Sequence, residues 1–233
     1  MPHERRPYRR ESEASRREAL ILATQELVAA GGPAAATVRA IAERAGVTPG
    51  LIRHYFGSKD ELNRAAYRTL MDGMTDVGMD AVAGVGASAE ERLAAFVASS
   101  LRPPVVDAGA VGLWAGYLHT VRSDPALLAL HEEAYLRYRD LLQELIAALE
   151  RPDCPEARLR QEAIACNAVI DGLWLEGSML PRGFAPGELV RIGLAAVGAI
   201  LGADLTRHTM FIPELTQPDL TKATGPDRQG APQ

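Results

Sequence analysis

Apolar residues recur at intervals of three and four positions through most of this chain, which is the period of an amphipathic α-helix. In residues 13–31, Leu20, Ala23 and Leu27 fall on one side, and Gly31–Gly32–Pro33 would stop the helix. No segment alternates apolar and polar residues as a strand does, and no internal repeat is found. The pattern therefore predicts an all-α protein. Helices are expected at about 13–31, 37–44, 48–55, 58–83, 88–101, 107–122, 125–149, 155–180 and 186–201.

A short helix, a glycine turn and a second short helix are predicted between residues 37 and 62. Gly46 follows the first helix, where a left-handed residue suits glycine. Thr48 is a good N-cap and Pro49 a good first helical residue, so the next helix restarts at once. Ser58 and Glu61 then form a capping box for the helix after it. Two short helices joined by such a turn are the geometry that places a recognition helix in a DNA major groove.

A family resemblance covers the same segment. Residues 16–62 resemble the N-terminal domain of the TetR family of one-component transcription regulators. The matching positions are Leu20, Gly31, Gly32, Thr37, Ile41, Ala42, Ala45, Gly46, Val47, Tyr55, Phe56, Lys59 and Leu62. The resemblance implies an N-terminal three-helix domain with a helix-turn-helix, joined to a helical domain that binds an effector and dimerises. The expected division is 1–12 as a flexible basic arm, 13–62 as the DNA-binding domain, 63–203 as the ligand-binding and dimerisation domain, and 204–233 as a disordered tail.

Charge is distributed unevenly along the 233 residues, whose formal net charge is −5. Residues 1–70 contain 12 Lys/Arg against 8 Asp/Glu, whereas the other 163 residues contain 13 against 22. A basic module followed by an acidic one is what a DNA-binding head on an effector-binding body would show. We therefore expect double-stranded DNA as a partner despite the acidic total.

Cysteine usage and hydropathy restrict the remaining classes of protein. Cys154 and Cys166 fit a reducing compartment and lie in no metal-ligand spacing. No apolar run approaches the length of a membrane span, and the arginine-rich start lacks the hydrophobic region of a signal peptide. We expect a cytoplasmic protein with no membrane partner, no metal and no cofactor.

An all-helical enzyme is the alternative from a different class. Residues 131–135, His-Glu-Glu-Ala-Tyr, fail the metalloprotease spacing at their last position. No Ser/His/Asp arrangement and no glycine-rich phosphate loop stands out. A DNA-bending protein without an effector is disfavoured by the large aromatic body. We therefore expect a regulator and not an enzyme.

Ten residues are predicted to contact DNA. They are Thr37, Arg39, Thr48, Pro49, Gly50, Leu51, Arg53, His54, Tyr55 and Lys59. Gly50 would let the backbone approach the groove, Leu51 could touch a thymine methyl, and Arg53 could bind guanine through two hydrogen bonds. Arg39 matches a family position that reaches base edges, and the threonine, histidine, tyrosine and lysine side chains suit phosphate contacts. Solvated charge is the alternative role for both arginines. The core is expected to contain Ile41, Val47, Ile52, Phe56 and Leu62.

The helix predicted at 155–180 carries a polar stripe on an otherwise apolar segment. Asn167, Asp171, Trp174 and Ser178 are spaced by four, three and four residues, which places them on one side of the helix. Because burying unpartnered polar groups is costly, this stripe must meet water, a ligand or hydrogen-bond partners of its own.

The same helix extends the resemblance to one branch of the family. Residues 168–177, AVIDGLWLEG, resemble the BetI-like branch of choline-responsive repressors, and Trp114 matches a tryptophan of that branch. The resemblance implies a small-molecule effector, such as a quaternary ammonium, held by aromatic faces and one carboxylate. The candidate ligand-binding residues are Trp114, Tyr117, Tyr135, Tyr138, Asn167, Asp171 and Trp174.

Two other interpretations of these residues stay open. The aromatic side chains could pack the core, with Asp171 capping a helix or pairing in a dimer interface. Leu118 also replaces an aromatic residue of the BetI-like branch, so the alternative is a repressor of an efflux or catabolic operon that senses an apolar or polyamine-like compound.

The last predicted helix offers a surface for a second copy of the chain, because its large apolar residues alternate with glycine and alanine. The residues expected to dimerise are Leu189, Ile192, Gly193, Val197 and Ile200. In TetR-like proteins the last two helices form a four-helix bundle across a two-fold axis, which implies a homodimer on a palindromic operator with half-sites about 34–36 Å apart. The sequence thus predicts a dimeric repressor that a small molecule releases from its operator.

Overall fold

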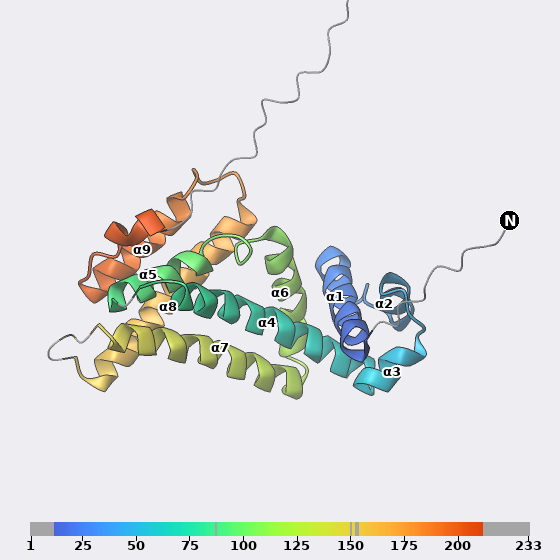
Figure 1. The fold of residues 1–233 in the computed structure, drawn as a ribbon. Coiled ribbons are helices and arrows are strands. Elements are labelled where there is room, and N and C mark those ends of the chain that lie inside the picture. The colour runs from blue at the N-terminus through green and yellow to red at the C-terminus, as the bar shows by residue number, and fades with distance from the viewer. Residues whose placement is uncertain (1–11, 87, 150, 152–153, 212–233) are drawn as a thin grey trace, which may run out of the picture.

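A computed structural model describes residues 12–86, 88–149, 151 and 154–211 of the chain. These residues form nine α-helices and one short 3-10 helix, and they contain no strand (Figure 1). The predicted all-α class is confirmed, and each predicted helix is present with ends that agree to about two residues. None of the helices in these ranges has the length and apolar character that a membrane span needs.

The first three helices form a small head at one end of the molecule (Figure 1). They are α1 (Glu13–Gly31), α2 (Val38–Arg44) and α3 (Gly50–Phe56). Gly46 makes the turn between α2 and α3 with a φ of 67°, a conformation that favours glycine. Four of the five residues predicted for the core are buried, namely Ile41, Ile52, Phe56 and Leu62. The fifth, Val47, is half-buried.

The start of α3 differs from the prediction. The Thr48 side chain does not cap the helix, which begins at Gly50 with Pro49 in the capping position and no side-chain hydrogen bond. Instead, the backbone carbonyl of Thr48 accepts the N–H of Leu51 at 3.1 Å. The Thr48 hydroxyl therefore makes no capping hydrogen bond, and the residue is exposed.

Helix α4 (Lys59–Ala83) runs from the head into the body and belongs to both. The Ser58 hydroxyl caps it by accepting the N–H of Glu61 at 3.1 Å, as the sequence predicts. Tyr67, near the head end of α4, is buried in the same apolar cluster as the first three helices, whereas Val82 lies in the body cluster. With 25 residues the helix is about 37 Å long, so a shift at its body end is carried to the head.

The body consists of the next five helices. They are α5 (Ala89–Ser100), α6 (Ala108–Val121), α7 (Pro125–Ala147), α8 (Glu156–Met179) and α9 (Glu188–Leu201). Helix α4 packs between α5 and α7, α8 packs on α7 and α9, and α6 packs against α1 of the head (Figure 1). The body core is built mainly from leucine, valine and isoleucine, with Phe96 fully buried at its centre.

The predicted disordered tail from residue 204 is wrong for its first part. Leu205 is fully buried, and a 3-10 helix, η1 (Thr206–Phe211), packs on α5 and α9. Arg207 forms an ion pair with Glu90 of α5, which ties this segment to the body. Leu205 and the Arg207–Glu90 ion pair hold this segment on the body. Residues 212–233 and the arm at 1–11 lie outside the described residues.

Candidate functional site

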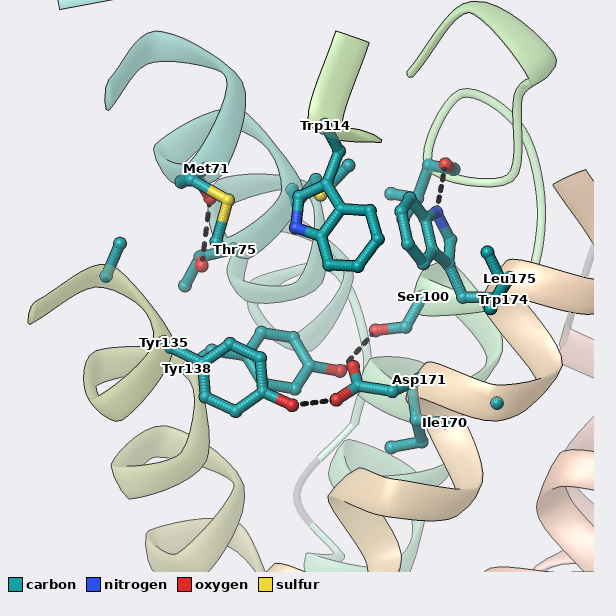
Figure 2. A pocket seen from close by; sticks show the side chains of 14 residues that line it. Met71, Thr75, Ser100, Trp114, Tyr135, Tyr138, Ile170, Asp171, Trp174 and Leu175 are labelled. Atoms are coloured by element: carbon teal, nitrogen blue, oxygen red, sulfur yellow. Dashed lines mark hydrogen bonds between the residues drawn. The ribbon is translucent and has the colours of Figure 1, made fainter. Parts of the chain in front are cut away.

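A cavity of about 300 Å³ lies inside the body, between α4, α6, α7 and α8 (Figure 2). Its walls are mostly apolar, and its lining comes from helices that are far apart in sequence. The lining residues are Met71, Met74, Thr75, Ser100, Val105, Trp114, Ala134, Tyr135, Tyr138, Ile170, Asp171, Gly172, Trp174 and Leu175. Its volume is at the lower end of the range of about 300–1,000 Å³ that is usual for small-molecule sites.

Two tryptophans form one wall of this cavity. The indole N–H of Trp174 donates to the carbonyl of Val105 at 2.8 Å, which fixes the orientation of the buried ring. Trp114 meets Trp174 edge to face, with ring centroids 5.5 Å apart and planes at 87°. This is a preferred geometry for aromatic pairs, so the wall is preorganised.

The carboxylate of Asp171 lines the same cavity, about one turn before Trp174 on α8. The Tyr135 hydroxyl donates to Oδ2 of Asp171 (Figure 2). The Asn167 amide donates to the same oxygen at 2.9 Å and to the Tyr135 hydroxyl at 3.0 Å. Burial raises the pKa of Asp171, although these hydrogen bonds oppose the shift. Burial also raises the pKa of Tyr135 to about 12, so its hydroxyl stays a neutral donor.

Asp171 therefore brings a negative charge to the edge of an apolar cavity. Among the described residues, no arginine, lysine or histidine forms an ion pair with it. Its partners are neutral donors, which hold the carboxylate in place without cancelling its charge. A cation placed in the cavity would supply the missing charge.

A second polar point lies beside Asp171. The hydroxyl of Tyr138 is 2.9 Å from that of Ser100, and the Tyr138 ring packs 5.0 Å from the ring of Phe96. Burial raises the pKa of Tyr138, so this pair is neutral as well. The cavity thus combines aromatic faces, one carboxylate and neutral hydroxyl groups.

The seven predicted ligand-binding residues separate into three groups. Five line the cavity: Trp114, Tyr135, Tyr138, Asp171 and Trp174. Asn167 stands behind Asp171 and orients it. Tyr117 lies outside the cavity, because it comes almost one turn after Trp114 on α6 and is buried against Tyr67, with ring centroids 5.0 Å apart.

Sequence reasoning missed the contribution of α4 to the cavity. Met71, Met74 and Thr75 line it, but in the sequence they are ordinary members of the apolar stripe of a long helix. Ser100 was missed for a similar reason, since it is a small residue at the end of a mostly apolar helix. No local signal distinguishes such residues from core.

The predicted DNA-contacting residues gather on α2, α3 and the start of α4. Thr37 caps α2 by accepting the N–H of Ala40 at 3.1 Å. Arg39, Thr48, Pro49, Gly50, Arg53 and His54 are exposed, and Leu51, Tyr55 and Lys59 are half-buried. Open space surrounds the position that a side chain at Gly50 would occupy, so nothing in the protein blocks a close approach there.

The predicted dimer residues need a correction. Leu189, Gly193 and Val197 are buried within the chain itself, so they hold α9 on its own body instead of facing a partner. A side-chain carbon at Gly193 would lie only 2.1 Å from Leu101, which explains the glycine as a site of close packing with α5. Ile192 is 41 % exposed and Ile200 is half-buried.

Comparisons with known proteins identify the family from both halves of the chain. Residues 20–66 match the profile of the bacterial regulatory proteins of the tetR family, and residues 89–202 match that of the C-terminal domain of BetI-type transcriptional repressors. A regulator named BetI 2 from Chromohalobacter salexigens is 34% identical over 181 residues, which cover 76% of this chain and 84% of that protein. The chain belongs to the TetR family. It is a transcription regulator of the BetI type, not an enzyme.

Another relative and two solved structures are also similar to this chain. BetI of Stenotrophomonas maltophilia is 32% identical over 169 residues, covering 72% of this chain and 84% of that protein. A transcriptional regulator from Pseudomonas aeruginosa has a crystal structure with a TM-score of 0.76 and 30% identity, covering 85% of this chain and 96% of that one. A regulator from Saccharomonospora viridis, solved in complex with choline, has a TM-score of 0.62 over 86% of this chain and 98% of that one. At 19% identity, the last comparison shows a shared fold only.

The environment of Asp171 predicts a stability effect. Because the pKa of Asp171 is raised by burial, the unliganded protein gains stability as the pH falls and this carboxylate is protonated. Asp171→Asn keeps the shape and removes the charge, so we expect Tm at pH 7 to rise by about 2–4 °C, or about 1 kcal/mol. Thermal unfolding followed by circular dichroism measures it.

The matched control for this substitution is Asp140→Asn, which changes an exposed aspartate of α7 and should leave Tm almost unchanged. If Asp171→Asn melts below the wild type while the control does not, the charge of Asp171 is compensated within the protein and the cavity has no need of a cation.

Proposed function

We propose that this BetI-type regulator acts as a homodimer on a palindromic operator and leaves it when a small monocation, such as choline, enters the α4–α8 cavity. The observation that carries the proposal is the carboxylate of Asp171, which is held by Tyr135 and Asn167 in an aromatic cavity without a cationic partner among the described residues.

The chemistry of the lining supports a quaternary ammonium group. A cation over an aromatic face gains about 2 kcal/mol or more when it is desolvated, and Trp114, Trp174, Tyr135 and Tyr138 offer such faces. The regulator from Saccharomonospora viridis holds choline in the same fold, which makes choline the first ligand to test.

The alternative effectors fit this cavity less well. A polyamine-like compound carries several positive charges, whereas Asp171 is the one carboxylate in the described lining. A purely apolar compound would leave the charge of Asp171 buried without compensation, which is costly. A monocation with an apolar shell satisfies both constraints.

The proposed contact with DNA uses the exposed side of α3. Arg53 would bind guanine through two hydrogen bonds, worth about 1–3 kcal/mol of discrimination, and Leu51 would touch a thymine methyl. Lys59, at the N-terminus of α4, would hold a phosphate, aided by the positive end of the helix dipole.

The proposed dimer interface is the exposed side of α8 and α9. Large apolar side chains are accessible there, including Ile164, Leu175 and Met179 on α8 and Ile192 on α9. Alanine and glycine residues between them are exposed too, and would allow the helices of two chains to approach closely. A two-fold axis through this surface would present two heads to two half-sites.

Helix α4 would connect the effector to DNA. Met71, Met74 and Thr75 line the cavity, and Lys59 lies 12–16 residues earlier on the same helix, about 18–24 Å away. A ligand that displaces α4 in the cavity therefore displaces the head. It shifts the equilibrium only by its differential affinity for the two positions of the helix.

The proposal predicts that choline weakens operator binding. An operator is selected from a random duplex library with the purified protein, and its Kd is measured by fluorescence anisotropy with and without choline. We expect saturating choline to raise the operator Kd about 5- to 150-fold, the usual range of allosteric coupling. Asp171→Asn should bind the operator like the wild type and ignore choline.

The outcomes of this experiment separate the parts of the proposal. Operator binding that choline leaves unchanged would contradict the effector assignment. An Asp171→Asn variant that still responds to choline would show that the carboxylate is not the ligand's partner.

A second prediction concerns the role of Arg53. Arg53→Ala should relax base preference at one position of each half-site, because a bidentate contact to guanine is lost. Lys59→Ala, the control, should weaken binding to all sequences alike. It should also lower the slope of log K against log[salt] by about 0.9, the value for one lost phosphate contact. Repeated operator selection with each variant measures both effects, and equal weakening on all sequences by Arg53→Ala would make Arg53 a phosphate contact instead.

A further inference from the structure

A chain of contacts leads from the cavity to the head half of α4 by way of α7. Tyr135, which donates to Asp171, lies one turn after His131 on α7, and their ring centroids are 5.7 Å apart. On its other side, Nδ1 of His131 is 2.7 Å from the hydroxyl of Tyr67 on α4. Helices α4 and α7 lie side by side over this region (Figure 1).

The bond between Tyr67 and His131 joins a buried side chain to a half-buried one. Tyr67 has no exposed surface, and burial lowers the pKa of His131 while it raises that of Tyr67. Neutral forms of both groups are favoured, and one hydrogen bond joins the Tyr67 hydroxyl to Nδ1 of His131, with the donor set by the tautomer of the imidazole. Breaking this bond would leave buried polar groups unpaired, which is costly. The bond therefore opposes sliding of α4 along α7.

A second tie lies closer to the head. Arg64 makes a two-pronged contact with Asp124, with its Nε 3.1 Å and one terminal nitrogen 3.0 Å from the carboxylate. Asp124 also caps α7 by accepting the N–H of Ala126 at 2.9 Å. This ion pair is partly exposed and screened by salt, whereas Tyr67 in the other contact has no exposed surface.

A cation in the cavity would act on the Tyr135–Asp171 hydrogen bond, the first contact in this series. The hydroxyl of Tyr135 and the amide of Asn167 both donate to the same oxygen of Asp171, so a cation that draws on this carboxylate competes with Tyr135. The imidazole of His131 packs against the Tyr135 ring, so a shift in the position of that ring would move His131 and disturb its hydrogen bond with Tyr67.

We propose that the Tyr67–His131 pair is the positioning contact through which an occupied cavity changes the register of α4 on α7 and so releases the operator. This inference rests on the proposed effector site, and it assigns the coupling to two residues that touch neither ligand nor DNA.

The test compares two tyrosines that differ by their hydrogen bond. Tyr67→Phe removes the hydroxyl that bonds His131, whereas Tyr117→Phe removes a buried hydroxyl that has no hydrogen-bond partner in the structure. The two rings are 5.0 Å apart in the same core, so the control matches the test in burial and in chemistry. His131→Leu removes the imidazole that bonds Tyr67 and serves as an independent variant.

The measured quantity is the ratio of operator Kd with and without saturating choline, with the choline Kd in the absence of DNA as a second reading. For Tyr67→Phe and His131→Leu we expect this ratio to fall about 2- to 30-fold, while choline still binds. The double variant should lose no more than either single one, since both remove the same bond. Tyr117→Phe should keep the wild-type ratio.

Several outcomes would overturn the inference. A wild-type ratio in Tyr67→Phe places the coupling elsewhere, and equal losses in Tyr67→Phe and Tyr117→Phe reduce it to general packing of this core. A wild type that binds choline but keeps its operator affinity fails the proposed function itself, and the inference with it. Thermal unfolding of each variant confirms that the native fold is present.

Discussion

The half-buried carboxylate of Asp171 is the constraint on which the arrangement of the cavity depends. A charge in an apolar cavity is unfavourable unless donors and an opposite charge surround it, and here two neutral donors hold one of its oxygens. Those donors come from α7 and from α8 itself, the aromatic faces come from α6, α7 and α8, and α4 closes the remaining side. The same helices that surround the carboxylate also bring α4 into contact with whatever occupies the cavity.

Helix α4 makes this local chemistry relevant to DNA. Its head end is buried with α1 and α3, and its body end is buried with α5, so the two apolar cores of the molecule share one rigid element. Gly78 brings α4 very close to the ring of Phe96, because a side-chain carbon there would lie only 2.7 Å from that ring. The body end of α4 is thus packed closely on α5, and the head end packs on α1 and α3 and makes polar contacts with α7.

The fold was predictable from the sequence because caps and helical periodicity are local. Ser58 caps its helix as predicted, and the turn at Gly46 follows from its conformation. What could not be predicted is which neighbour each apolar side meets. Leu189 and Val197 looked free for a partner but fill their own core, and Leu205 orders a segment whose composition suggests a tail. The polar stripe on α8 was the local sequence pattern that indicated a cavity, because the residues of α4 that line it resemble ordinary core.

One calorimetric comparison tests directly whether the cavity around Asp171 recognises positive charge. Choline and its uncharged analogue, in which carbon replaces the quaternary nitrogen, have nearly the same size and shape. If Asp171 and the aromatic faces read the charge, choline should bind at least about 30-fold more tightly, which corresponds to the cation–aromatic gain of about 2 kcal/mol. Equal affinity for the two compounds would contradict the account, because the cavity would then select for shape alone.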